Sequence, residues 1–135
     1  MDYKHIILKN DEGIHTLTLN RPSLRNAFND EMIAEIIDAF ERRIAGEPGR
    51  AVVIRGAGQA FCAGGDIRVL YDACKAGEMD YVASFYRDEY RLNRKIKTYA
   101  KPYVALIDGI VMGGGVGVSV HGRYRVATER TLFAM

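Results

Sequence analysis

Two glycine-rich stretches are the residues best suited to chemistry in this sequence. The first contains Gly64 and Gly65, and the second contains Gly113, Gly114 and Gly115 in succession. Glycine has no Cβ, so a ligand can approach the main chain closely at such a turn and meet unpaired N–H groups. A segment that can be helical follows each stretch, and a helix N-terminus adds partial positive charge. Both turns therefore suit an anion or a developing negative charge.

Neither turn matches the common phosphate-binding loops. Residues 113–118 lack the third glycine of a dinucleotide fingerprint, and no Lys-Ser or Lys-Thr pair follows them. The segment that begins at Gly56 fails as well, because Phe61 stands at its third-glycine position. One N–H group from each turn could instead converge on a single oxygen, as in an oxyanion hole. Tight packing between strands and helices explains the same glycines, and spacing alone slightly favours it.

Glu89 is a second candidate, because it interrupts an apolar stripe. Residues 80–99 predict a long helix whose inward positions are Val82, Phe85, Glu89, Leu92, Ile96 and Tyr99. A carboxylate in such a row costs free energy unless it is partnered or has a task. Glu89 either pairs with an arginine or with Lys101, or it contacts a ligand, and the pattern leaves both interpretations open.

The remaining reactive side chains are weaker candidates. Cys62 lies in the first glycine turn, but no histidine is near it in sequence, so a packing role is favoured over a nucleophile. Asp66 is expected to cap the helix that follows it. His5, His15 and His121 lie far apart and pair with no cysteine or carboxylate at ligand spacing, so we expect no metal site.

These residues must be positioned by an α/β fold. Strand, glycine turn and helix occur in that order twice, at 52–75 and at 104–121, which predicts two neighbouring parallel units whose turns emerge at one edge of a sheet. The other expected elements are a hairpin of 3–9 with 14–20, an amphipathic helix at 30–46, and strands at 123–127 and 131–134.

Composition limits the class of protein. The 135 residues predict a single domain, and an apolar fraction of 48% is enough for a core. A net charge of +2 is too small to indicate nucleic-acid binding. The longest apolar run, 110–120, is broken by glycines and shorter than the ~20 residues of a membrane span. Without a signal-peptide pattern, and with two cysteines outside metal spacing, the chain is expected to be cytoplasmic.

Four motifs together resemble the crotonase (enoyl-CoA hydratase/isomerase) superfamily, in the order of that family and along the whole chain. They are Leu19-Asn-Arg-Pro22 with Asn26-Ala27, Ala60-Phe-Cys-Ala-Gly-Gly-Asp-Ile67, Lys101-Pro-Tyr-Val-Ala-Leu-Ile-Asp-Gly109, and Met112-Gly-Gly-Gly115. The resemblance implies a crotonase-like spiral of ββα turns, cut off after the second glycine-turn unit. Residues 1–135 would then be the N-terminal part of a CoA-binding core domain, and the apolar segment 132–135 agrees with such a truncation.

The resemblance also implies a site for an acyl-CoA. The N–H groups of Gly65 and Gly114 would form the oxyanion hole for the thioester carbonyl, and Glu89 would contact the substrate. The residues expected along the adenine and pantetheine track are Ala63, Gly64, Asp66 and Ile67, with Ser23 to Arg25 near the nucleotide. No metal or redox cofactor is implied, because CoA enters as part of the substrate. A homo-oligomer is expected, with no nucleic-acid or membrane partner.

Within the superfamily the likeness is greatest to the 3-hydroxyisobutyryl-CoA hydrolases, thioester hydrolases of valine degradation that lie in the mitochondrial matrix in eukaryotes. Hydratases carry a catalytic glutamate shortly after the glycine triplet, where this sequence has Gly117. The hydrolase pattern accepts glycine there, but its own catalytic glutamate and aspartate would follow Met135. We therefore expect a hydrolase-type site and little or no activity from this chain alone. The alternatives are an enoyl-CoA hydratase or isomerase, and a non-catalytic CoA-binding fragment.

Overall fold

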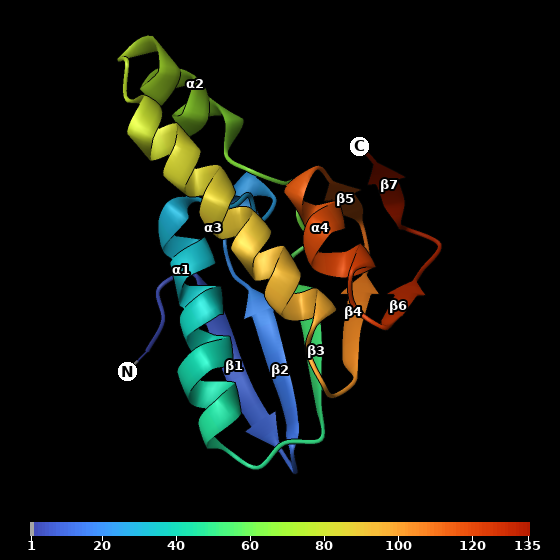
Figure 1. Cartoon of the computed structure of the whole chain (residues 1–135). Coiled ribbons are helices and arrows are strands. Elements are labelled where there is room, and N and C mark those ends of the chain that lie inside the picture. Colours follow the sequence, from blue (N-terminus) through green and yellow to red (C-terminus); the bar gives the residue numbers. More distant parts are fainter. Residues whose placement is uncertain (1) are drawn as a thin grey trace.

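The fold is built around a five-stranded sheet with the strand order β1-β2-β3-β4-β6 (Figure 1). The computed structural model describes residues 2–135. Strand β1 pairs antiparallel with β2, and β2, β3, β4 and β6 run parallel to one another. The strands are β1 Ile6–Asp11, β2 Ile14–Leu19, β3 Ala51–Gly56, β4 Tyr103–Ile107 and β6 Tyr124–Ala127.

Helices connect the parallel strands and lie over one face of the sheet (Figure 1). The helices are α1 Asp30–Asp38, α2 Ile67–Lys75, α3 Met79–Lys97 and α4 Gly114–Val120, and a short 3-10 turn occupies Pro22–Leu24. Helix α1 begins where the Asn29 side chain accepts a hydrogen bond from the N–H of Met32, and it continues through a π-helical segment, Ala39–Ile44. The expected helix at 30–46 is therefore present, with a wider turn in its second half.

The core follows from simple alternation in the strands. In β2 the buried side chains are His15, Leu17 and Leu19, and the residues between them are half-buried. Met32, Ile33, Ile36 and Ile37 of α1 are buried at helical spacing. A single layer of helices on the sheet thus forms the core that carries the two glycine turns.

His15 is a polar residue inside this core. Its side chain is 1% exposed, and neither ring nitrogen has a hydrogen-bond partner among residues 2–135. The ring lies against the main chain at Gly49, where an added Cβ would come within 2.7 Å of Nε2. A buried polar group without a partner costs free energy, so this histidine weakens the fold.

Replacing His15 with leucine is expected to raise the free energy of unfolding by about 1 kcal/mol, because the unpaired imidazole is removed from the core. Urea denaturation followed by circular dichroism measures the change. The matched control is His121→Leu at an exposed position, which should stay within about 0.5 kcal/mol of the unsubstituted chain. A loss of stability in His15→Leu would show that the ring nitrogens have a partner, such as a buried water.

The two predicted βα units are confirmed as neighbours, because β3 and β4 pair in parallel. The second unit differs from the expected order of strand, glycine turn and helix, however. A short strand, β5 (Ile110–Met112), stands between β4 and α4, and it pairs in parallel with β7 (Leu132–Ala134) in a separate two-stranded sheet. Helix α4 ends at Val120, one residue before the expected end of this unit at 121.

The long helix α3 carries the predicted stripe, with Phe85, Glu89, Leu92 and Ile96 all buried. Helices α2 and α3 form a hairpin that extends past the end of the sheet (Figure 1). No helix among residues 2–135 has the combination of length and apolar character that a membrane span requires.

Candidate active site

The two glycine turns lie side by side and are joined by main-chain hydrogen bonds. The N–H groups of Phe61 and Cys62 both donate to the carbonyl oxygen of Ile110, each at 3.0 Å. The N–H of Met112 donates to the Cys62 oxygen, also at 3.0 Å. The first turn thus runs along β5 as an extra strand, which explains how β5 brings the glycine triplet to it.

The turns also touch at their glycines. Gly64 adopts a φ of +100°, and a Cβ added to it would lie 3.0 Å from the nitrogen of Gly114. Side chains on either turn would therefore push the two apart. The prediction that these glycines allow close main-chain packing is confirmed. The other prediction, that they bind an oxygen of a ligand, stays open.

Asn26 holds the first turn in place, a role that sequence reasoning did not assign. The residue is fully buried, and its Nδ2 lies within hydrogen-bonding distance of the carbonyl oxygens of Ala57, Ala60 and Phe61, at 2.9, 2.9 and 3.2 Å. Its Oδ1 accepts a hydrogen bond from the N–H of Arg21 at 2.8 Å. Its place in the motif Leu19-Asn-Arg-Pro22 with Asn26-Ala27 could have suggested this role, because a buried amide group must find several hydrogen-bond partners.

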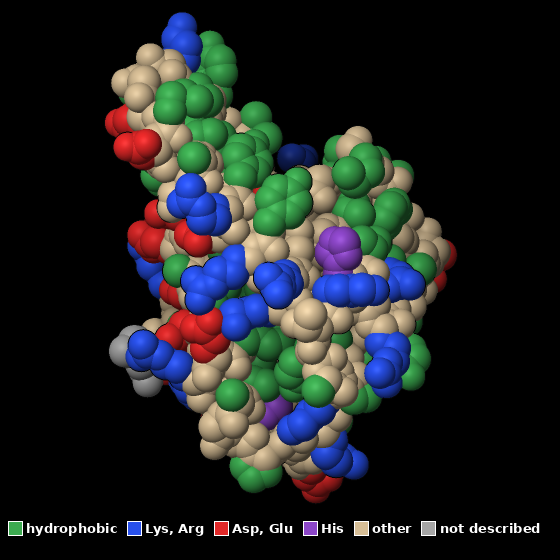
Figure 2. Space-filling model, in the orientation of Figure 1, with side chains coloured by type: hydrophobic (Ala, Val, Ile, Leu, Met, Phe, Trp, Pro, Cys, Tyr) green, Lys and Arg blue, Asp and Glu red, His purple; other side chains and the backbone are tan. Residues whose placement is uncertain are grey.

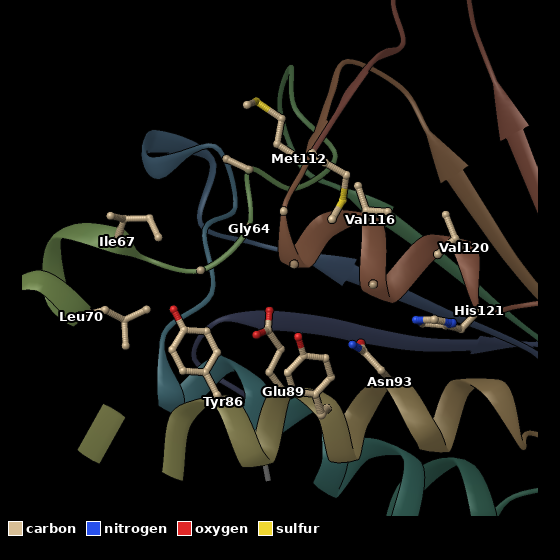
Figure 3. Close-up of a pocket in the computed structure, with 17 residues that line it drawn as sticks. Gly64, Ile67, Leu70, Tyr86, Glu89, Asn93, Met112, Val116, Val120 and His121 are labelled. Atoms are coloured by element: carbon tan, nitrogen blue, oxygen red, sulfur yellow. The ribbon is translucent and has the colours of Figure 1, made fainter. Parts of the chain in front are cut away.

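A cavity of about 590 Å³ opens between the two turns, helix α3 and helix α4. Six of the eight predicted site residues line it: Ala63, Gly64, Gly65, Ile67, Glu89 and Gly114. The other walls are largely apolar and include Leu70, Met112, Val116 and Val120 (Figure 3). Hydrophobic side chains also surround the region on the surface, over the α2–α3 hairpin and near β5 and β7 (Figure 2).

Gly65 and Gly114, the two residues predicted to supply N–H donors, both line this cavity. Gly114 is the first residue of α4, so its N–H has no acceptor within the helix. On either side of Gly65, the Gly64 oxygen and the Asp66 N–H are bonded to Phe28, at 2.7 and 2.8 Å. Neither glycine N–H donates a hydrogen bond to another residue of the described chain. The convergence of these two N–H groups on one oxygen atom stays a prediction.

Glu89 is the one acidic side chain that lines this cavity within residues 2–135. It is 7% exposed, and burial raises the pKa of its carboxyl group. Its Oε1 would lie 2.1 Å from a Cβ added to Gly114, so the carboxyl group sits directly against the second glycine turn. Figure 3 shows the side chain rising from α3 toward that turn.

The pairing interpretation of Glu89 is wrong for the described residues. No arginine or lysine forms an ion pair with it, and Lys101 instead donates to the Gly49 carbonyl oxygen at 2.7 Å. A buried carboxyl group without a protein partner is expensive to keep. That cost favours the ligand-contact interpretation.

Two predicted substrate residues lie outside the cavity. Asp66 caps α2, accepting from the N–H of Val69 at 3.4 Å as expected, and it also forms an ion pair with Arg21 at 3.6 Å. Arg25 lies instead at a second cavity of about 1030 Å³, which it lines with Ser23, Gln59 and Arg130. Arg130 is already paired there with Asp108 at 3.0 Å. Asp66 and Arg25 therefore do not line the cavity that contains Glu89.

The geometry supports neither a nucleophilic role for Cys62 nor a metal site. Burial raises the pKa of the Cys62 thiol to about 12, which suppresses the thiolate that a nucleophile requires. Its Sγ donates to the Asn26 oxygen at 3.2 Å, as a packing residue would. Among residues 2–135, no three His, Cys, Asp or Glu residues are grouped so that they could hold a metal ion.

The face that α4 turns to the cavity carries no acid. Gly117 stands where the hydratase pattern has a glutamate, and the amide of Asn93 fills the adjacent space. A Cβ added to Gly117 would lie 2.8 Å from Nδ2 and 2.9 Å from Oδ1 of Asn93. A larger side chain at this position requires Asn93 to move.

The sequence pattern of the enoyl-CoA hydratase/isomerase family matches residues 14–135, and the chain belongs to that family. Its fold is the crotonase-like α/β fold. A carnitinyl-CoA dehydratase from Mycobacterium thermoresistibile superposes with a TM-score of 0.92 at 41% identity, over 98% of this chain and 39% of that one. An enoyl-CoA hydratase from Rhodobacter sphaeroides superposes with a TM-score of 0.89 at 39% identity, over 98% and 40%.

Curated relatives bear the name 3-hydroxyisobutyryl-CoA hydrolase, mitochondrial. The protein from Gallus gallus is 49% identical over 131 residues, covering 96% of this chain and 34% of its own length. The protein from Danio rerio is 55% identical over 120 residues, covering 88% and 31%. The chain therefore spans about a third of the length of the curated relatives it matches.

Proposed function

We propose that this chain forms the thioester-binding part of an acyl-CoA hydrolase site of the 3-hydroxyisobutyryl-CoA hydrolase type. The observation that carries the proposal is Glu89, a buried carboxyl group without an ion-pair partner, directly against the second of two adjoining glycine turns. The names of the relatives support the same substrate class. The proposed compartment is the mitochondrial matrix in a eukaryote and the cytoplasm otherwise, and the proposed assembly is a homo-oligomer.

In the proposed site the thioester carbonyl oxygen accepts hydrogen bonds from the N–H groups of Gly65 and Gly114. Each such donor contributes about 3 to 4 kcal/mol when charge develops on the oxygen. Ala63, Gly64 and Ile67 provide the wall for the pantetheine arm. Arg25, in the second cavity, supplies a positive charge suited to the phosphates of the nucleotide.

The reaction is the addition of water to the carbonyl carbon and the loss of CoA as its thiol. The C–S bond breaks, a carboxylic acid forms, and the sulfur takes a proton. Glu89, whose pKa burial raises, can donate a hydrogen bond to the substrate while protonated. The carboxylate that acts as base or nucleophile in the related hydrolases would follow Met135. The proposal therefore assigns binding and carbonyl polarisation to these residues.

Hydration of an enoyl-CoA is the competing function, favoured by the names of the superposed structures. That chemistry in the related hydratases uses a glutamate at the position of Gly117. Here the Asn93 amide fills the space beside this glycine, and no acid on α4 reaches the cavity. The site therefore favours thioester cleavage over water addition.

Calorimetric titration of this chain with 3-hydroxyisobutyryl-CoA tests the proposal, with free CoA as the reference ligand. We expect saturable binding that is tighter for the thioester, since only the thioester has a carbonyl oxygen for the two N–H donors. A thiol assay on the same samples should detect little release of CoA. Failure to bind the thioester would contradict the proposal. Hydration of crotonyl-CoA that outpaces thioester cleavage would favour the hydratase.

A further inference from the structure

Asn93 is a buried side chain in the same cavity whose polar group lacks a partner. It is 9% exposed, and its Oδ1 forms no hydrogen bond among residues 2–135. It stands one helical turn after Glu89 on α3, and both side chains line the cavity (Figure 3). Buried amide oxygens are nearly always hydrogen-bonded in folded proteins, so an unpaired one here indicates a missing partner.

The surroundings of this amide do not provide that partner. On the facing wall, Val116, Gly117 and Val120 of α4 have no polar side chain, and His121 just after the helix lines the cavity without a hydrogen bond to Oδ1 of Asn93 (Figure 3). The absence of a side chain at Gly117 makes room for the amide. The amide therefore faces mainly apolar side chains, with few other polar groups near it, an arrangement typical of ligand sites that select by a small number of hydrogen bonds.

The position of Asn93 relative to Gly114 matches the dimensions of a short acyl chain. Gly114 and Gly117 are three residues apart, or about 4.5 Å along the axis of α4. In a 3-hydroxyacyl thioester the carbonyl oxygen and the hydroxyl oxygen are separated by about 3 to 5 Å, depending on rotation about the two C–C bonds between them. A hydroxyl group on an acyl chain whose carbonyl is bound at Gly114 can therefore reach the space beside Gly117, where the Asn93 amide lies.

We propose that Asn93 binds the hydroxyl group of the acyl chain and determines the preference for 3-hydroxyacyl thioesters. The proposal rests on the proposed function of the site. Oδ1 accepts the hydroxyl proton, which satisfies the unpaired oxygen. An acyl chain without the hydroxyl leaves that oxygen unpaired, so the site discriminates against it.

Binding of two CoA analogues to this chain tests the inference. Both are dethia analogues, in which a methylene group replaces the thioester sulfur so that hydrolysis cannot occur. One carries the 3-hydroxyisobutyryl group and the other the isobutyryl group. By calorimetry the unsubstituted chain should bind the hydroxylated analogue about tenfold more tightly. In Asn93→Leu the two affinities should become equal, while affinity for the isobutyryl analogue stays unchanged or rises.

The outcomes separate this inference from the function on which it rests. If neither analogue binds the unsubstituted chain, the proposed function fails. If both bind it equally, the CoA site stands and the role of Asn93 is overturned. A hydroxyl preference that persists in Asn93→Leu also overturns that role and assigns the hydroxyl group to another polar residue of the cavity, such as Glu89 or His121. Asn93→Ala, with its fold checked by circular dichroism, gives the same readout should the leucine not fit.

Discussion

Alanine at position 115 is expected to destabilise this protein by about 3 kcal/mol. Gly115 lies in the first turn of α4, and a Cβ on it would come within 2.2 Å of the Cys62 carbonyl oxygen. The obstructing atom belongs to the main chain, so no side-chain rotation can relieve the clash. The hydrogen bond from the Met112 N–H to that same oxygen must lengthen or break. The two glycine turns would move apart, and binding of the acyl-CoA would weaken with them.

Urea denaturation measures the loss, and Gly46→Ala is its matched control. No atom lies within 4 Å of a Cβ added to Gly46 at the end of the first long helical segment. Alanine there should leave stability unchanged or raise it by up to about 1 kcal/mol, because it restricts the unfolded chain more than glycine does. Equal behaviour of the two variants would mean that the turns are not packed as closely as described.

Methionine at position 89 is expected to stabilise the chain by about 1 to 3 kcal/mol near neutral pH, because a buried and unpaired carboxyl group is removed. The same change should weaken binding of 3-hydroxyisobutyryl-CoA about tenfold or more, because the proposed contact with the substrate is lost. A substitution that raises stability but weakens binding is expected at a residue whose role is functional and whose burial destabilises the fold. The control is Glu78→Met, at an exposed position before α3, which should change stability by less than about 0.5 kcal/mol.

The gain in stability from Glu89→Met should depend on pH. Burial raises the pKa of Glu89 in the folded state, whereas the unfolded chain ionises at the ordinary glutamate value. As pH rises above that ordinary value, the unfolded state releases its proton first, so the unsubstituted chain loses stability until the raised pKa is passed. The variant lacks this loss. Its advantage should therefore be smaller at about pH 4 than at about pH 8. An advantage that grows toward acid pH would contradict the burial argument.

The arrangement of the main elements was predictable because local signals were strong. Helix α2 occurs at the predicted residues, and α3 differs by one or two residues at each end. Helical spacing and capping by Asp66 define these elements without reference to the rest of the chain. The parallel pairing of β3 with β4 follows from two successive strand–turn–helix units.

The parts that could not be predicted depend on contacts between distant residues. Strand β5 has three residues and was not predicted; it forms by pairing with β7, which was predicted at 131–134 but without this partner. Glu89 could be recognised as unusual from its stripe, but its lack of a partner required the surrounding side chains to be placed. Asn93 lies beside that stripe, where a polar residue is unremarkable in sequence. Its unpaired oxygen becomes evident only when α4 packs against α3.

The glycine turns also determine how this site can be altered. What they present to the cavity is main chain, which every amino acid possesses, so proline is the one substitution that can take away an N–H group itself. Any other substitution acts by blocking access to them, and one methyl group at position 114 or 115 is enough to collide with a neighbouring atom. The proposed site therefore depends on the absence of side chains at these glycines. Adding a side chain there disrupts it, even though no functional group is removed.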